Sequence, residues 1–220
     1  MMHSYIICNH FVSAQFMLEV INLACSRGEH RLFTGLDFVL NAGQLMQVQG
    51  TNGSGKTTLL RALCGFLQQD EGEVRWDGKN VRQAKEQYLA DMFYLGHHNA
   101  IKDELSALEN LCMSAGMAGY QVDEQTALSA LRRMGLRGRE RLPVKVLSQG
   151  QRRRVALARL LVEEARLWIL DEPLTALDVG AVSLMEELIG EQLSKGGAVI
   201  FTTHQPLAVS GVETRRLALS

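Results

Sequence analysis

The sequence predicts an α/β fold with a buried parallel sheet, an N-terminal antiparallel β subdomain and an inserted helical subdomain. Residues 167–170 and 198–201 are continuous apolar runs, which is typical of parallel strands covered on both faces. Residues 50–57 form a glycine-rich segment between an apolar run and leucines at helical spacing. That order indicates a strand, a loop and a helix, which form the centre of the predicted fold.

Composition limits the classes of protein to which the chain can belong. It has 220 residues, of which 46% are hydrophobic and 21% charged, with a formal net charge of -1. These values are typical of a globular chain, and the charge balance gives no indication of nucleic-acid binding. No apolar run approaches the ~20 residues needed to span a bilayer. The four cysteines are scattered without C-x-x-C spacing, so neither a zinc site nor a disulfide framework is indicated.

We expect one domain over residues 17–220, with the helical subdomain at about residues 98–150. Residues 1–16 contain a short apolar stretch interrupted by polar side chains, and they lack the basic start of a signal peptide. Met17 is a candidate for the natural start. The preceding segment is therefore interpreted as an extension of uncertain role.

The region before the glycine-rich segment predicts β structure. Residues 18–25 are a strand candidate and residues 27–30 a turn, and Leu36, Phe38 and Leu40 alternate with Asp37 and Val39. Residues 45–48 then read as a short buried strand. Further along, residues 73–76 and 79–81 flank Asp77-Gly78, a pair that favours a two-residue hairpin turn.

The glycine-rich segment fits the phosphate-binding pattern G-x-x-x-x-G-K-[ST]. Backbone N–H groups at a helix N-terminus can bind phosphate oxygens, and glycines allow the backbone to approach closely. Lys56 is expected to contact the β- and γ-phosphates, and the Thr57 hydroxyl to bind Mg²⁺. A chance glycine-rich turn is the alternative, but the flanking strand and helix disfavour it. The expected nucleotide-binding residues are Gly50, Thr51, Asn52, Gly53, Ser54, Gly55, Lys56, Thr57 and Thr58.

A helical insertion and a second buried strand follow. Residues 105–147 have helical patterning, punctuated by Gly135 and Pro143, and a further helix is predicted from about residue 148 through 161. The strand at 167–170 ends in Asp171-Glu172. Asp171 can approach Mg²⁺, and Glu172 can orient a water and accept its proton. The alternative is that two acids merely complement a helix dipole.

These motifs resemble the ATP-binding cassette (ABC) ATPases, over about residues 18–217. The phosphate loop, residues 147–151 (similar to the family signature LSGGQ), residues 170–173, residues 175–178 and His204 occur in the family order. Ser148 and Gln151 also form a capping box, so Ser148 can simply cap its own helix. The resemblance implies that Ser148, Gln149 and Gly150 face ATP held by a second subunit. It also implies catalytic roles for Lys56, Glu172 and His204.

Two positions depart from the family pattern. Most cassette ATPases have a glutamine that contacts Mg²⁺ and water where a strand meets the helical insertion, and the matching position here is taken as His98, with shorter reach. His97 is interpreted as a buried histidine. Arg27 lies where relatives stack adenine on an aromatic ring. A guanidinium can stack on a base, but a solvated turn residue is an equal alternative.

Some less specific sequence patterns resemble the ATPase subunits of bacterial cytochrome c maturation complexes. They lie at residues 94–97, 101–102, 105–111 and 203–207. The resemblance implies a homodimer bound to integral membrane subunits at the cytoplasmic face of the inner membrane. It implies either haem export or release of a haem-loaded chaperone, with the chaperone an indirect partner. The alternatives are an exporter of another substrate, a soluble cassette ATPase, or a module that uses ATP only as an allosteric ligand. Arg152, Arg153 and Arg154 are interpreted as a solvated or subunit-facing helix surface.

Overall fold

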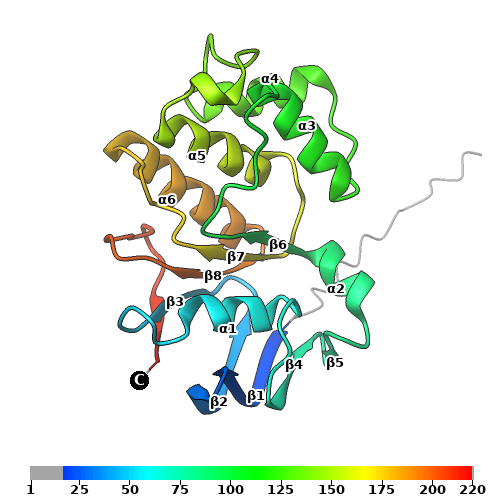
Figure 1. The fold of residues 1–220 in the computed structure, drawn as a ribbon, viewed down its shortest axis with the longest axis vertical. Helices are drawn as coiled ribbons and strands as arrows, with labels where there is room; N and C mark the ends of the chain where they lie inside the picture. Colours follow the sequence, from blue (N-terminus) through cyan, green and yellow to red (C-terminus); the bar gives the residue numbers. More distant parts are fainter. Residues whose placement is uncertain (1–16, 220) are drawn as a thin grey trace, which may run out of the picture.

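The computed structural model describes residues 17–219, so the predicted extension at 1–16 lies outside the described part of the chain. A five-stranded parallel sheet forms its centre, in the order β6-β7-β8-β3-β9 (Figure 1). Its strands are β6 (Met92–Leu95), β7 (Leu167–Asp171), β8 (Ala198–Thr202), β3 (Leu45–Gln49) and β9 (Thr214–Ala218). The predicted α/β class is confirmed.

The apolar runs are continuous because both faces of the sheet are covered. In β7, Leu167 and Ile169 pack into one hydrophobic core, whereas Trp168 and Leu170 pack into the other. All five residues of β7 and all five of β8 are buried. Alternate side chains point to opposite faces of a strand, so two covered faces require an unbroken apolar sequence.

The predicted N-terminal β subdomain is an antiparallel sheet of order β2-β1-β4-β5. Its strands are β1 (Met17–Arg27), β2 (His30–Asn41), β4 (Glu71–Trp76) and β5 (Lys79–Asn80). Asp77 and Gly78 have φ angles of 49° and 75°, as a two-residue hairpin of this kind requires. The predicted hairpin at Asp77-Gly78 is therefore confirmed. The predicted turn at residues 27–30 is confirmed as well, because Arg27 pairs with His30 where β1 turns into β2.

Helix α1 (Lys56–Leu63) lies between the two sheets (Figure 1). Its buried side chains include Leu59, Leu60 and Leu63, which pack in the core shared with the antiparallel sheet. Gly65 follows the helix in the left-handed region, at φ 70°, and its N–H donates to the carbonyl of Ala62. The predicted C-terminal stop is confirmed, because a glycine adopts this conformation without a Cβ penalty.

Four helices cover the opposite face of the parallel sheet, with α3, α4 and α5 gathered farthest from it (Figure 1). They are α3 (Ala107–Met117), α4 (Glu124–Arg133), α5 (Gln149–Leu157) and α6 (Val179–Ser194). The helix expected to reach residue 161 becomes a 3-10 helix at Ala158–Leu161. A short 3-10 helix, Val144–Val146, precedes α5.

Three elements had no counterpart in the sequence prediction. Helix α2 (Lys85–Asp91) runs directly into β6, and β9 forms the edge of the parallel sheet. Strand β9 has a mostly polar, partly exposed sequence, and β6 has only four residues, so neither gives a periodic signal.

Among residues 17–219, none of the helices combines the length and apolar character needed to cross a membrane.

Candidate functional site

The glycine-rich loop connects β3 to α1 and brings the predicted phosphate-binding residues to the carboxyl edge of the sheet. Gly55 has φ 97°, and a Cβ there would lie 3.1 Å from Leu32 and 3.2 Å from the ring of Phe33. A larger residue would therefore strain the loop. The ammonium of Lys56 folds back over the loop and donates to the carbonyls of Gly50, at 2.8 Å, and Thr51, at 3.0 Å.

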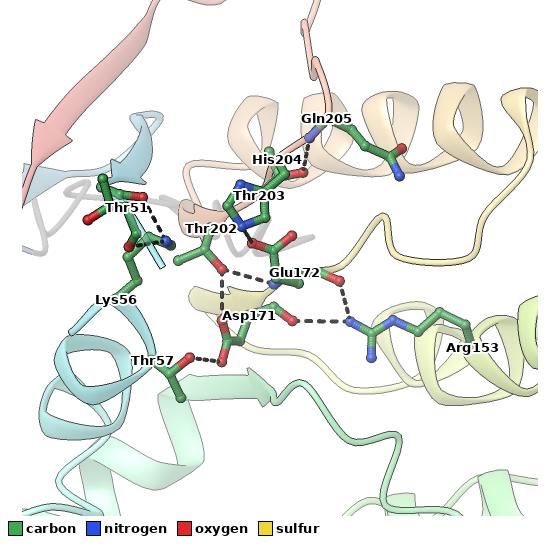
Figure 2. A network of polar contacts seen from close by, with 11 residues as sticks. Thr51, Lys56, Thr57, Arg153, Asp171, Glu172, Thr202, Thr203, His204 and Gln205 are labelled. Carbon is green, nitrogen blue, oxygen red and sulfur yellow. Dashed lines mark hydrogen bonds and ion pairs between the residues drawn. The ribbon is translucent and has the colours of Figure 1, made fainter. Parts of the chain in front are cut away.

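Asp171 lies at the end of β7, where its carboxylate joins two hydroxyl groups (Figure 2). Thr57 at the start of α1 donates to Oδ2 at 2.8 Å, and Thr202 at the end of β8 donates to Oδ1 at 2.8 Å. Asp171 is 2% exposed, so these hydrogen bonds compensate for a carboxylate removed from water. The three residues come from three segments that meet because the parallel strands end at one edge.

Glu172 has a left-handed backbone, with φ 50°. Its N–H donates to Thr202 Oγ1 at 2.9 Å, which fixes the peptide group that follows Asp171. Carboxylate oxygen Oε1 is buried without a hydrogen-bond partner, and the ring of His204 lies nearby, with Nε2 at 3.6 Å. The Glu172 side chain is 17% exposed and that of His204 61%. A partly buried acceptor with an unfilled oxygen can take a proton from a bound water.

These residues line one open cleft of about 490 Å³. From the sequence-predicted set, the lining includes Arg27, Asn52, Gly53, Gly55, Lys56, Thr57, Thr58, Asp171, Glu172 and His204. Arg27 is exposed at the end of β1 and faces this cleft. Its guanidinium is thus placed where it can meet the end of a ligand held by the loop.

Of the neighbouring pair His97 and His98, His97 is the one that lines the cleft. Both histidines are exposed, so the expectation of a buried His97 is wrong. His98 lines a second cavity of about 340 Å³, together with Asp103 and Arg152, and its ring meets that of His97 edge to face at 5.5 Å. His97 is also part of the lining of that second cavity. β6 ends at Leu95, and the side-chain direction in the loop that follows has no sequence period, so the sequence alone could not distinguish the two histidines.

Ser148, Gln149 and Gly150 lie outside the cleft lining. Ser148 caps α5 and forms the predicted capping box with Gln151. Gln149 lines the second cavity. Gly150 packs so closely on residues 175–178 that a Cβ would lie 2.6 Å from the carbonyl oxygen of Ala176.

The residues present fit a nucleotide and a magnesium ion. Ser54 Oγ in the loop and Glu172 Oε1 in the cleft are both buried side-chain oxygens that have no hydrogen-bond partner. Asp171 and Thr57 offer the oxygen ligands that Mg²⁺ prefers. Within residues 17–219 no group of three His, Cys, Asp or Glu side chains could hold a metal ion. A magnesium ion with few protein ligands is one held largely by phosphates and waters.

Sequence reasoning missed Arg153, which is 3% exposed rather than solvated. It donates to the main-chain carbonyls of Asp171 and Glu172, next to the cleft (Figure 2). Burial lowers its pKa to about 10, while Asp171 and Glu172 act to raise it, so the group stays protonated at neutral pH. Burial, with a further contribution from Asp171, also raises the pKa of Tyr94 to about 12.

Comparison with known proteins agrees with the family that the sequence motifs resemble. The family model described as ABC transporter matches residues 33–175. A protein of Nitrosomonas europaea named cytochrome c biogenesis ATP-binding export protein CcmA is 57% identical over 204 residues, covering 93% of this chain and 96% of that protein. A protein of the same name from Escherichia coli O157:H7 is 48% identical, covering 93% and 97%.

Solved structures agree on the fold. A putative ABC transporter ATP-binding protein from Pyrococcus furiosus superposes with a TM-score of 0.79 at 26% identity, covering 92% of this chain and 97% of its own. The overall α/β architecture is therefore shared with that protein. The chain belongs to the ABC transporter family and has the fold of that family's ATP-binding proteins.

Proposed function

We propose that this chain is the ATPase subunit of a membrane complex that serves c-type cytochrome biogenesis, bound peripherally at the cytoplasmic face of a bacterial inner membrane. Its 57% and 48% identity to proteins named CcmA, over nearly their whole length, supports the biological role. One observation carries the chemistry. The buried Oε1 of Glu172 has no hydrogen-bond partner and stands beside an aspartate bound to the hydroxyl of Thr57.

In this proposal the loop and Lys56 hold the phosphates of ATP, while Thr57 and Asp171 provide the protein oxygens for Mg²⁺. When bound, the ion neutralises charge that develops on the phosphates. Glu172 orients the attacking water and accepts its proton. His204, with Nε2 3.6 Å from Glu172, holds that carboxylate toward the cleft and contacts the terminal phosphate.

His97 takes the place that the sequence resemblance assigned to His98. Because His97 is part of the cleft lining, we propose that its imidazole contacts the phosphates or the water. Because His97 also lines the second cavity, it belongs to both spaces. We assign it to the nucleotide site and leave His98 to the second cavity.

Two copies of the chain complete the site. Ser148, Gln149 and Gly150 stand at the N-terminus of α5, away from the chain's own cleft, where free N–H groups can meet the phosphates held by a second copy. The exposed Val179, 84% accessible at the start of α6, lies just beyond residues 175–178 and suits a surface covered on dimer formation. Integral membrane subunits are the proposed further partners.

The test is cytochrome c maturation in cells that carry Glu172→Gln. The variant keeps the shape and polarity of the side chain but removes the proton acceptor. We expect c-type cytochromes to be lost while other haem proteins stay normal. The matched control is Glu164→Gln, because Glu164 is exposed and lies outside the cleft. Normal maturation in the Glu172 variant would contradict the proposed role and favour an exporter of another substrate.

The same cells separate two forms of the proposal. If ATP drives haem export, the periplasmic chaperone should remain without haem, since the blocked step precedes loading. If ATP drives release, a haem-loaded chaperone should stay bound to the membrane complex. We favour release, and the measurement is the haem content and location of the chaperone.

A further inference from the structure

Arg153 has every donor of its guanidinium engaged. An arginine side chain has five N–H groups. Nε donates to Pro173 O at 3.3 Å, Nη1 to Gly96 O at 3.2 Å and Asn99 Oδ1 at 2.9 Å, and Nη2 to Asp171 O at 3.1 Å and Glu172 O at 2.7 Å. All five acceptors are neutral oxygens, four of them main-chain carbonyls. The side chain therefore fixes backbone rather than neutralising a carboxylate.

The five acceptors belong to two segments that are far apart in the chain. One is the loop after β6, at residues 96–99, which contains His97; its contacts with Arg153 span 57 and 54 residues. The other is the end of β7 with Glu172 and Pro173. Arg153 itself lies in α5, four residues after the first residue of that helix. One buried side chain thus joins two segments that contribute residues to the cleft lining to the helix whose N-terminus is capped by Ser148.

The contact with Glu172 has a specific consequence. A residue other than glycine at φ 50° is strained and persists only where its surroundings hold it. The N–H of Glu172 donates to Thr202 Oγ1, and its carbonyl accepts from Arg153, in the shortest of the five bonds. Both main-chain polar groups of Glu172 are therefore held, the N–H by Thr202 of β8 and the carbonyl by Arg153 of α5.

We infer that Arg153 is a positioning residue for ATP hydrolysis, which acts through the backbone of Glu172 and keeps its carboxylate aligned with the loop that contains His97. The inference rests on the proposed function of Glu172 as the proton acceptor. Lysine cannot replace the arginine, because its three donors share one atom and cannot reach acceptors on both segments. A movement of α5 would therefore shift the backbone of Glu172 through this side chain.

The test is single-turnover hydrolysis of Mg-ATP by the full chain, kept with the integral membrane proteins that it retains in detergent. Arg153→Met and Arg153→Lys are each measured alone and combined with Glu172→Gln. We expect Arg153→Met to lower the rate about 10²-fold, as expected for a misplaced reacting group, while the Kd for ATP is little changed. Arg153→Lys should lie between Arg153→Met and the parent.

The decisive comparison is non-additivity. If Arg153 acts through Glu172, Arg153→Met should cause little further loss once Glu172 is already glutamine. An equal loss in both backgrounds would overturn the inference. A parental rate in Glu172→Gln alone would instead reject the role of Glu172, so the two failures are distinguishable.

Arg159→Met is the control for loss of a partly buried arginine from the 3-10 helix that directly follows α5. Arg159 is bound to Glu163 and lies 4.8 Å from the centre of the Phe93 ring, away from the cleft lining. It should lower the melting temperature while the hydrolysis rate stays near the parental value. If both Arg153 variants fail to fold, or if Arg159→Met slows hydrolysis equally, Arg153 has only a role in stability and the inference is wrong.

Discussion

The hydroxyl of Thr57 donates a 2.8 Å hydrogen bond to Oδ2 of Asp171, across 114 residues of sequence. Thr57 is the second residue of α1 and Asp171 is the last residue of β7. Helix α1 packs in the same hydrophobic core as Leu167 and Ile169 of β7. The contact joins the phosphate-binding loop to the carboxylate pair. In the proposed function these two side chains provide the protein oxygens for Mg²⁺.

Thr57→Val should weaken this junction. The variant loses a hydrogen bond to a buried carboxylate, so the free energy of unfolding should fall by about 1–3 kcal/mol. The Mg²⁺ concentration that half-saturates ATP binding should also rise. Thr57→Ser keeps the hydroxyl and is the control. Unchanged Mg²⁺ dependence in the valine variant would remove Thr57 from the proposed metal site.

Glu172→Gln should separate binding from hydrolysis. Loss of the proton acceptor is expected to slow turnover by about 10²–10⁴-fold, with ATP still bound. Two copies should then remain associated in ATP, which size-exclusion chromatography with and without nucleotide can measure. A variant that turns over ATP at nearly the parental rate would mean that another group takes the proton.

Mixing two inactive variants tests the shared site. Lys56→Ala removes phosphate binding, and Ser148→Arg blocks the N-terminus of α5. Neither homodimer has an intact site, whereas a heterodimer has one, because both changes fall on the other site. We expect ATPase activity to return partly on mixing. No recovery in verified heterodimers would contradict independent sites shared between two chains.

The two neighbouring histidines should behave differently. His97→Ala is expected to lower hydrolysis by more than it lowers ATP affinity, because His97 lines the cleft. His98→Ala, with a side chain in the second cavity, should leave hydrolysis by the isolated chain close to parental. The reverse result would restore the position first expected from the sequence.

Stability should fall at alkaline pH. Burial, with a smaller contribution from Asp70, raises the pKa of the Cys25 thiol from 9.0 to about 11. Below pH 9 both states keep the proton, but between about pH 9 and 11 the unfolded state alone loses it, so the free energy of unfolding decreases. Burial raises the pKa of Cys64 in the same direction. Urea titrations should show a shallower decrease in Cys25→Ala, and equal slopes would contradict the assignment.

Local features of the fold were accessible to sequence reasoning. The Asp77-Gly78 turn, the capping box of Ser148 and Gln151 and the stop at Gly65 each depend on backbone preferences of a few adjacent residues. The glycine-rich loop at residues 50–57 and the strand that ends in Asp171 were also predicted from adjacent residues. Helix α2 and strands β6 and β9 were not, since short or polar elements are stabilised by neighbours that the local sequence does not contain.

By itself, the sequence determined which chemical groups are available: a glycine-rich phosphate-loop motif, an aspartate and a glutamate at the end of a buried strand, and histidines at positions 97, 98 and 204. Only the tertiary structure decided which of these groups meet. It put His97 rather than His98 into the cleft, and it buried Arg153 among five oxygens although its neighbours in the chain suggested a solvated surface. The physical reason is that a turn or a cap is encoded by adjacent residues, whereas a buried guanidinium needs acceptors from segments that only folding brings together.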